Sequence, residues 1–245
     1  MGLLAVFVLC VALSGLAVKP VAESYERQKR FITDAGHELK TPLTVISANN
    51  ELIEMTYGET QETRAVAKQI EKMNAMVKNL TLLAKLSETR NAINKREFSL
   101  SGALNDCAEI FTPSLSAEGK IFAKTVAEDM LVNGDEELIR RVFCIIFDNA
   151  AKYARSYINL NAFREGKFAV IELENDALGI KNGNLSRCFE RFYRGEYARA
   201  SSAGGNGIGL SAAKAIIEMH GGEITAEGKN DVFKIKITLK TVAST

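Results

Sequence analysis

The sequence predicts an α+β protein built from three parts in chain order. Three observations predict it: an unbroken apolar run at the N-terminus, a seven-residue repeat of apolar side chains after it, and short apolar runs that alternate with helical segments over the rest of the chain. We expect an N-terminal transmembrane helix, a helical hairpin that forms a dimeric four-helix bundle, and an α/β sandwich domain. The expected boundaries of the three parts are residues 1–20, 21–92 and 96–241.

The composition has no strong charge bias. Hydrophobic residues make up 47% of the chain and charged residues 25%, which is ordinary for a folded domain, and the formal net charge is +1. No basic stripe runs along any segment, so nothing in the sequence points to a nucleic-acid partner. The four cysteines are scattered without a CxxC pair, which predicts reduced thiols rather than a disulfide framework or a zinc site. With only two histidines, a histidine-rich metal site is excluded.

Residues 2–18 are apolar or small without interruption, a length at the short end of what spans a bilayer. A cleaved signal peptide is the alternative, but it normally carries a positive charge before the apolar run. Here the positive charges come after the run, at Lys19, Arg27, Lys29 and Arg30. By the positive-inside rule, the domains that follow face the cytoplasm. We therefore expect a membrane anchor and a location at the cell membrane.

Two amphipathic helices follow the apolar run, with a turn between them at 56–59. In the first helix the apolar side chains recur every seven residues, at Ile32, Leu39, Ile46 and Ile53. In the second they repeat at spacings of three and four, at Ile70, Met73, Val77, Leu80 and Ala84. Two such helices joined by a short loop predict an antiparallel hairpin. One hairpin buries only one stripe, so we expect a homodimer that pairs two hairpins into a four-helix bundle.

From about residue 94 the pattern changes to short strands between helices. The expected strands are 98–100, 121–126, 157–162, 168–173, 223–226 and 232–239, and the expected helices are 104–115, 136–153 and 208–220. In the last strand, apolar side chains alternate with lysine and threonine, so one face of that strand is buried. These elements predict an α/β sandwich with a sheet on one side and helices on the other.

His37 is a candidate nucleophile in the first helix. With Leu39 and Ile46 on the apolar stripe, His37 falls on the opposite, exposed face, and Gly36 leaves room beside it. A lone exposed histidine on a helix is, by itself, an ordinary surface residue. The run 31–43, however, closely resembles the phosphoacceptor box of bacterial two-component sensor histidine kinases.

The resemblance implies that His37 accepts a phosphoryl group. A neutral imidazole nitrogen is a competent nucleophile near neutral pH. In this family the acidic residue after the histidine, here Glu38, accepts the proton from the other ring nitrogen. Glu38 and Thr41 together resemble the family's phosphatase motif, in which the threonine places the water that hydrolyses the phosphorylated response regulator.

Asn149 continues the apolar stripe of the predicted helix 136–153. A buried asparagine is usually a structural hydrogen bonder, but the run 142–153 resembles the asparagine box of the same family. The resemblance implies that Asn149 binds Mg²⁺ through its amide oxygen, that Lys152 contacts a phosphate and that Tyr153 packs near the nucleotide. Mg²⁺ commonly takes one protein ligand plus phosphates and waters, so a single amide suffices.

The glycine-rich run 204–210 leads into the predicted helix 208–220. Its spacing differs from that of a Rossmann motif, and a glycine-rich run alone is often a plain loop. Glycine amides and a helix N-terminus together form an anion site suited to a triphosphate. The run resembles the family's second glycine box, which places nucleotide contacts at Gly205, Gly207, Ile208, Gly209 and Leu210. His220 ends the helix, where we expect a structural cap rather than a catalyst.

Arginines and aromatic residues cluster between residues 187 and 194. As a charge run this segment fits a solvated face, but it also resembles the family's phenylalanine box, which opens the lid over ATP. The resemblance implies that Phe189 and Phe192 anchor this lid. It also implies that arginines of the segment, among them Arg191 and Arg194, meet the γ-phosphate as charge develops during transfer.

The first glycine box of the family is matched less well. Counting back from Gly179 and Ile180, the family's adenine-reading aspartate falls on Asn175. An asparagine oxygen can still accept from the adenine amino group, although the hydrogen bond is weaker without the charge. Asp176 substitutes only with a shifted register. Ala177 stands where a glycine is usual, which matters if that backbone needs a positive φ.

The resemblance covers nearly the whole chain and implies one main function. The implied function is that of a sensor histidine kinase, which autophosphorylates His37 from ATP with Mg²⁺. The kinase then passes the phosphoryl group to an aspartate in the receiver domain of a response regulator. Phosphatase activity is expected as well, and the catalytic domains are expected in the cytoplasm. The alternative, motivated by Asn175, Ala177 and Ile145, is a catalytically weak pseudokinase or a phosphatase-biased dimeric docking module. A related chaperone or mismatch-repair ATPase shares the sandwich but leaves 31–43 unexplained.

Overall fold

The computed structural model describes residues 2, 34–36, 38–88, 93–195 and 207–242. The chain divides into two compact units, Met1–Lys85 and Leu86–Thr245. Apart from Gly2, the predicted membrane anchor at residues 1–20 lies outside the described part of the chain. Within the described residues, no helix combines the length and the apolar character needed to cross a bilayer.

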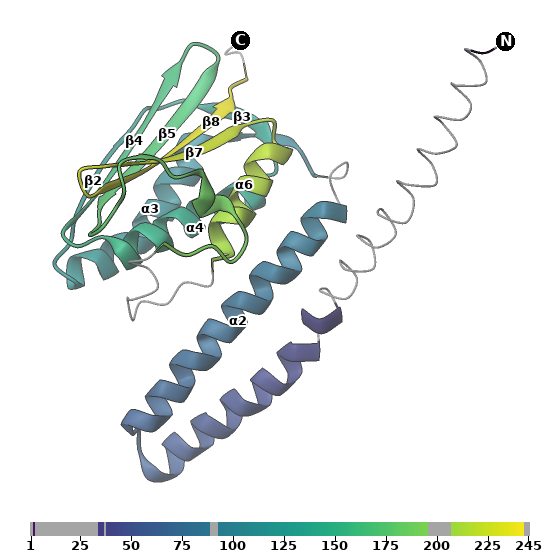
Figure 1. The fold of residues 1–245 in the computed structure, drawn as a ribbon, viewed down its shortest axis with the longest axis vertical. Coiled ribbons are helices and arrows are strands. Elements are labelled where there is room, and N and C mark those ends of the chain that lie inside the picture. The colour runs from purple at the N-terminus through teal and green to yellow at the C-terminus, as the bar shows by residue number, and fades with distance from the viewer. Residues whose placement is uncertain (1, 3–33, 37, 89–92, 196–206, 243–245) are drawn as a thin grey trace. The chain divides into compact units, whose positions relative to one another are not determined.

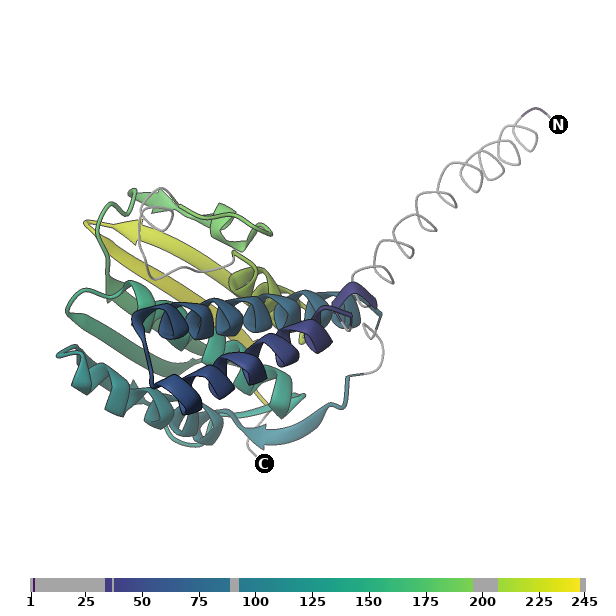
Figure 2. The ribbon, with the colours of Figure 1, turned by 90° about the horizontal axis from the view of Figure 1, so that it is seen from below.

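The first unit contains an antiparallel hairpin of two helices, residues 38–57 and α2 (Gln61–Glu88) (Figure 1). Figure 2 shows the two helices side by side from a second direction. The turn contains Gly58, whose φ of 85° lies in the left-handed region. Thr60 and Thr63 cap the N-terminus of α2, because the backbone N–H of each donates to the hydroxyl of the other, at 3.0 and 3.2 Å. The predicted hairpin is confirmed.

The interior of the hairpin is not formed by the seven-residue repeat. The buried residues in the described part of the hairpin are Leu43, Asn50, Thr63 and Ile70, at 2%, 6%, 7% and 6% exposure, together with Gly36. The Asn50 amide donates to the carbonyl of Thr63 at 3.1 Å and so joins the two helices near the turn. The repeat itself stays 45%, 47% and 47% exposed at Leu39, Ile46 and Ile53. A single chain therefore leaves an apolar stripe on the surface of its hairpin.

The second unit alternates strands and helices. In chain order its elements are β1 (Arg96–Ser99), α3 (Leu100–Ala117), β2 (Ile121–Val126), β3 (Leu131–Gly134), α4 (Glu136–Tyr153), β4 (Tyr157–Glu165), β5 (Phe168–Asp176), β6 (Gly183–Asn184), a short 3-10 helix (Ser186–Phe189), α6 (Gly209–Met219), β7 (Glu223–Lys229) and β8 (Val232–Lys240). Six strands form one sheet in the order β2-β4-β5-β8-β7-β6, in which β2 and β4 are parallel and the other pairs antiparallel. Strands β1 and β3 form a separate antiparallel pair.

Helices α3, α4 and α6 lie on one face of the six-stranded sheet (Figure 1). The alternation predicted for β8 explains this arrangement, because Ile235, Ile237 and Leu239 are all buried on the helix-covered side. On the other side, the ammonium group of Lys234 pairs with carboxylates of β5, at 3.2 Å from Glu172 and 2.7 Å from Glu174. The predicted α/β sandwich is therefore confirmed.

Several boundaries differ from the prediction by a few residues, and two strands were not predicted. The first strand ends at Ser99 rather than at residue 100, because the Ser99 hydroxyl accepts from the N–H of Gly102 at 3.0 Å and caps α3. Helix α3 therefore begins at Leu100, ahead of the predicted start at residue 104. Strands β3 and β6 were not predicted, because runs of four and two residues are too short to carry a periodic signal.

Candidate active site

The predicted phosphoacceptor, His37, lies outside the described residues, but the helix is described on both sides of it. Glu38 and Thr41 are exposed, so both side chains reach solvent. Gly36 is buried against α2, and a Cβ built on it would run into the hydroxyl of Thr81. The prediction that Gly36 leaves open room is therefore wrong, because Thr81 fills that space.

Asn149 lies on a half-buried face of α4, together with Leu138 and Ile145. Ile145 packs against the start of α6, since its Cγ2 lies 3.3 Å from the position of a Cβ on Gly209. Asn149 is one helical turn further along α4. Its side chain makes no hydrogen bond to any residue in the described part of the chain. Asn149 is thus not a structural hydrogen bonder within that part, and its amide oxygen is available to a ligand.

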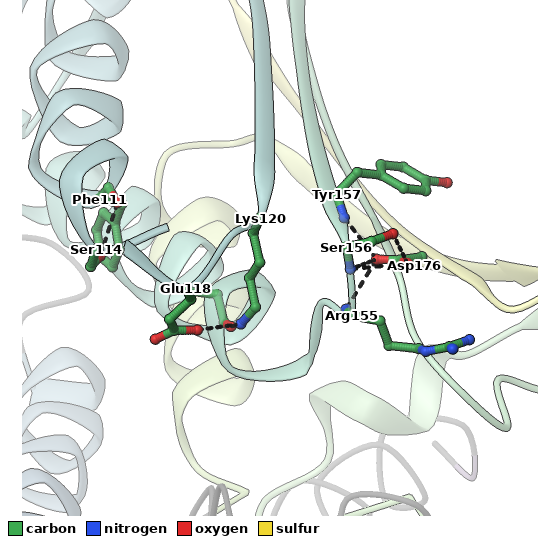
Figure 3. Close-up of polar contacts among 9 residues, drawn as sticks. Phe111, Ser114, Glu118, Lys120, Arg155, Ser156, Tyr157 and Asp176 are labelled. Carbon is green, nitrogen blue, oxygen red and sulfur yellow. Dashed lines mark hydrogen bonds and ion pairs between the residues drawn. The ribbon is translucent and has the colours of Figure 1, made fainter. Parts of the chain in front are cut away.

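The C-terminal end of α4 carries the two other residues of the asparagine box. Lys152 is exposed, and its ammonium group pairs with the carboxylate of Asp148 at 2.6 Å. Tyr153 is half-buried. Lys120, beside β2, donates from its ammonium group to the carbonyl of Ala151 at 2.6 Å, which satisfies a carbonyl of the last helical turn (Figure 3). The helix end is therefore fixed in place by a residue distant in sequence.

The start of α6 offers backbone amides rather than side chains. Ile208 is the residue before the helix, and no side chain caps the helix at this end. The N–H groups of the first turn, beginning at Gly209, therefore have no helical acceptor and face outward with the positive end of the helix dipole. Leu210 is half-buried, while Gly205 lies outside the described residues. An anionic group is the ligand that suits this helix end.

Gly207 joins the glycine-rich run to the phenylalanine segment. Its carbonyl accepts from the backbone N–H of Phe192 at 2.8 Å. Its φ is 65°, and a Cβ on it would come within 2.8 Å of the Tyr193 carbonyl oxygen and of the Phe192 backbone. Both the left-handed conformation and the close approach require glycine at this position.

The two phenylalanines of the arginine-rich segment behave differently. Phe189 is 7% exposed, and it anchors the segment as predicted. Phe192 is 62% exposed with a φ of 63°, so the prediction that its ring anchors the segment is wrong. Its left-handed turn directs the backbone toward the glycine run and leaves the ring in solvent. Arg191 is exposed and Arg194 half-buried.

Asn175 and Asp176 end β5 in different environments. Asn175 is 2% exposed, and its amide nitrogen donates to the carbonyl of Asp176 at 3.2 Å, which leaves the amide oxygen as an acceptor. The Asp176 carboxylate accepts from the hydroxyl of Ser156 at 2.6 Å and from the backbone N–H groups of Arg155, Ser156 and Tyr157 (Figure 3). Burial raises the pKa of Asp176, but these hydrogen bonds outweigh it and hold the pKa at about 2. The Asp176 carboxylate therefore binds the segment that follows α4. This argues against a shifted register in which Asp176 would replace Asn175 as the residue that contacts adenine.

The loop after β5 accommodates Ala177 without strain. Ala177 is buried and is not among the described residues with a positive φ. The left-handed position is instead Gly179, with a φ of 70°. The alanine therefore costs no backbone strain, and the loop keeps glycine where its conformation requires one.

Helix α4 packs against both α6 and β5. The packed elements carry the half-buried face of Asn149 on α4, the open amides at the start of α6, and Asn175 near the end of β5. Matches to two family models identify the domains that carry these features. Residues 134–241 match the family model of the histidine kinase-, DNA gyrase B- and HSP90-like ATPases, and residues 27–89 match that of the His Kinase A (phospho-acceptor) domain.

The chain belongs to the two-component sensor histidine kinases. It is 29% identical over 229 residues to the sensor protein DltS of Streptococcus agalactiae, covering 93% of this chain and 58% of DltS. It is 32% identical over 212 residues to the sensor histidine kinase YkoH of Bacillus subtilis, covering 84% of this chain and 46% of YkoH. The chain thus spans about half the length of these curated relatives. A crystal structure of full-length ShkA in complex with AMPPNP has the same fold, with a TM-score of 0.70 at 20% identity over 88% of this chain and 47% of that one.

In this member of the kinase family, His220 links the ends of two helices. Its Nε2 accepts from the backbone N–H of Asp135, the N-cap residue of α4, at 2.9 Å. Its Nδ1 lies 2.7 Å from the carbonyl oxygen of Ile216 in α6. Because Nε2 is an acceptor, Nδ1 carries the proton and donates, so the ring is neutral. The predicted structural role of His220 is therefore confirmed.

We expect the free energy of unfolding to depend on the protonation of His220. Burial lowers the pKa of His220, although the Ile216 carbonyl opposes this effect. The neutral ring is favoured in the folded state, so its contribution is complete above the usual histidine pKa of about 6.5 and is lost as the pH falls below that value. Urea unfolding at pH 7.5 and 5.5 should show a larger loss of stability for the wild-type chain than for His220→Gln, by about 1 kcal/mol. Equal losses in the two proteins would contradict this role.

Proposed function

We propose that this chain is the catalytic portion of a sensor histidine kinase that autophosphorylates His37 from ATP and then phosphorylates an aspartate in the receiver domain of a response regulator. The observation that carries the proposal is the pairing of an uncapped helix start at Gly209 with an Asn149 amide that bonds no described residue. A phosphoacceptor helix precedes this nucleotide-binding arrangement in the same chain. We take residues 21–92 and 96–241 as the two functional domains.

The phosphates of ATP fit the start of α6. The N–H groups at Gly209 and Leu210 and the helix dipole favour a negative charge there. Asn149 supplies one oxygen to Mg²⁺, and the remaining ligands come from phosphates and waters. Within the described residues, no group of three or more histidine, cysteine, aspartate or glutamate side chains forms an alternative metal cluster. When bound, the ion neutralises charge on the transferring phosphates.

The adenine base fits the end of β5. The oxygen of the Asn175 amide is the free acceptor, since the nitrogen donates to the Asp176 carbonyl. It can accept from the amino group of adenine, as a carboxylate would. Without the charge, this hydrogen bond is weaker than one to a carboxylate. We therefore expect ATP to bind, with lower affinity than in a matched chain that reads adenine with an aspartate in the same environment.

In the transfer step, an imidazole nitrogen of His37 attacks the γ-phosphorus of ATP. A phosphorus–nitrogen bond forms as the bond to the bridging oxygen breaks, and ADP leaves. Glu38 accepts the proton from the other ring nitrogen. Lys152 contacts a phosphate, and Arg191 and Arg194 stabilise the charge that develops on the transferring group.

The exposed stripe of the hairpin supports a homodimer. Leu39, Ile46 and Ile53 form a continuous apolar line that one chain cannot cover. Pairing two hairpins into a four-helix bundle covers that line in both chains. We propose this dimer as the form that presents His37 and docks the receiver domain. The segment at 1–20 anchors it to the cell membrane, with the catalytic domains in the cytoplasm.

Phosphatase activity is a second candidate function of the same helix. Glu38 and Thr41 are exposed and one helical turn apart, so both can reach a phosphorylated receiver domain. Both functions use Glu38, but the phosphatase reaction also needs Thr41 and requires no phosphoryl transfer from ATP.

Labelling with γ-phosphate-labelled ATP, with and without Mg²⁺, tests the proposal. We expect magnesium-dependent label on the chain that survives alkali and is lost in acid, the chemistry of a phosphorus–nitrogen bond. A chain that binds ATP but takes up no label contradicts the kinase assignment and favours the docking-module alternative. A chain that removes phosphate from a labelled receiver domain without labelling itself favours the phosphatase.

A further inference from the structure

The turn between β7 and β8 makes paired contacts with the loop that follows β5. Asn230 and Asp231 form this turn, with φ values of 51° and 59°. The Asp231 carboxylate accepts from the backbone N–H of Gly179 at 3.0 Å. The Asp231 carbonyl accepts from the backbone N–H of Ala177 at 2.7 Å. One residue thus holds two amides of the loop, through its side chain and its backbone.

Further contacts extend this attachment along the loop. The backbone N–H of Asn230 donates to the side-chain oxygen of Asn182 at 2.8 Å. Gly228, in β7, packs so closely that a Cβ on it would run into the carbonyl of Lys181 and the side chain of Ile180. The loop at 177–182 is therefore held near both its ends by the β7–β8 turn and packs at its centre against Gly228 of β7.

We propose that Asp231 is a positioning residue for nucleotide binding, because it fixes the loop at 177–182 in a conformation suited to the base and phosphates. The inference rests on the proposed function, since it requires Asn175 and this loop to contact ATP. A loop that is ordered before the ligand arrives loses less conformational freedom on binding. A charge-assisted hydrogen bond from the Gly179 N–H to the Asp231 carboxylate is stronger than one to an amide oxygen at the same position.

The competing explanation is that Asp231 only completes a hairpin turn. Both explanations predict some loss of stability when the side chain is changed. Only a positioning role predicts weaker nucleotide binding in a protein that is as folded as the wild type. The left-handed backbone at Asp231 allows a clean substitution, because Asp231→Gly removes the carboxylate and keeps the turn.

The experiment titrates ATP against the whole chain and its variants, and records thermal unfolding of each. We expect Asp231→Gly to raise the Kd for ATP and the KM of autophosphorylation about tenfold, with kcat changed much less. Asp231→Asn keeps an oxygen acceptor and should stay within about threefold of the wild type. Asp129→Gly is the matched control, because Asp129 is exposed, has a φ of 55° and lies in the turn between β2 and β3.

Each outcome decides between the two explanations. Weaker ATP binding in Asp231→Gly, with Asp231→Asn and Asp129→Gly close to the wild type, supports the positioning role. ATP affinity in Asp231→Gly equal to that of the wild type overturns it, as does an equal loss in Asp129→Gly. A wild-type chain that binds no ATP overturns the proposed function itself, so the two failures are distinguishable.

Discussion

Replacing Asn149 with alanine is expected to lower the rate of magnesium-dependent autophosphorylation at least about hundredfold, the usual cost of removing one group that stabilises the transferring charge. The structure separates this effect from folding. Asn149 is half-buried and makes no hydrogen bond to a described residue, so its loss leaves no partner unsatisfied. We therefore expect thermal unfolding of the Asn149→Ala chain within a few degrees of the wild type. The rate is measured from labelled ATP at saturating Mg²⁺.

Asn149→Asp is the matched control, because it keeps an oxygen at the same position. This variant should retain most of the activity lost in Asn149→Ala, with a changed dependence on Mg²⁺ concentration. An Asn149→Ala chain that phosphorylates at the wild-type rate would show that the amide oxygen has no part in the reaction.

The second large effect is expected at Gly207. A Cβ there would lie 2.8 Å from backbone atoms of Phe192 and Tyr193, which cannot move aside as a flexible side chain would. Gly207→Ala also places a side chain at a φ of 65°, at a cost of roughly 1–2 kcal/mol. The glycine run and the arginine-rich segment must then separate, which displaces the start of α6. We expect autophosphorylation to fall at least about tenfold, with the loss in ATP binding measured by titration.

Gly166→Ala isolates the cost of backbone strain from that of the clash. Gly166 has a φ of 58° in the β4–β5 turn, and a Cβ there meets nothing within 4 Å. The Gly166→Ala chain should lose about as much free energy of unfolding as backbone strain alone costs in Gly207→Ala. It should keep full activity. Equal activity in the two variants would mean that the close approach at Gly207 does not shape the nucleotide site.

Local sequence signals predicted much of the second unit. Helix α4 begins and ends at the predicted residues, Glu136 and Tyr153, because Asp135 caps it and one face is continuously apolar. The last strand was predicted from alternation alone, and Ile235, Ile237 and Leu239 are buried as the alternation requires. Helix capping and apolar periodicity each involve only residues close together in the chain, so both can be recognised in a single sequence.

Contacts between distant segments were not predictable in the same way. The carboxylate of Asp176 holds the segment after α4, and that of Asp231 holds the loop after β5, yet each aspartate reads as an ordinary turn residue. Their partners are backbone amides, which every residue type offers. A sequence pattern therefore cannot indicate which amide an aspartate will bind.

Periodicity identified the apolar residues of the hairpin but not what covers them. The repeat at Leu39 and Ile46 is exposed, while Leu43 is buried. A helix that will contact two neighbours carries two apolar faces, and the sequence does not say which face meets its own chain. The same limit explains the error at Gly36, whose missing side chain serves close packing with Thr81.

The proposed kinase reaction depends on His37 as the acceptor of the phosphoryl group from ATP. The chain has only two histidines, so His37→Ala and His220→Gln form a decisive pair. Each variant is incubated with γ-phosphate-labelled ATP and Mg²⁺, and the label that survives alkali but not acid is counted against the folded fraction. We expect wild-type label in His220→Gln and none in His37→Ala. Label of this kind that persists in His37→Ala would contradict the role of His37 as the acceptor.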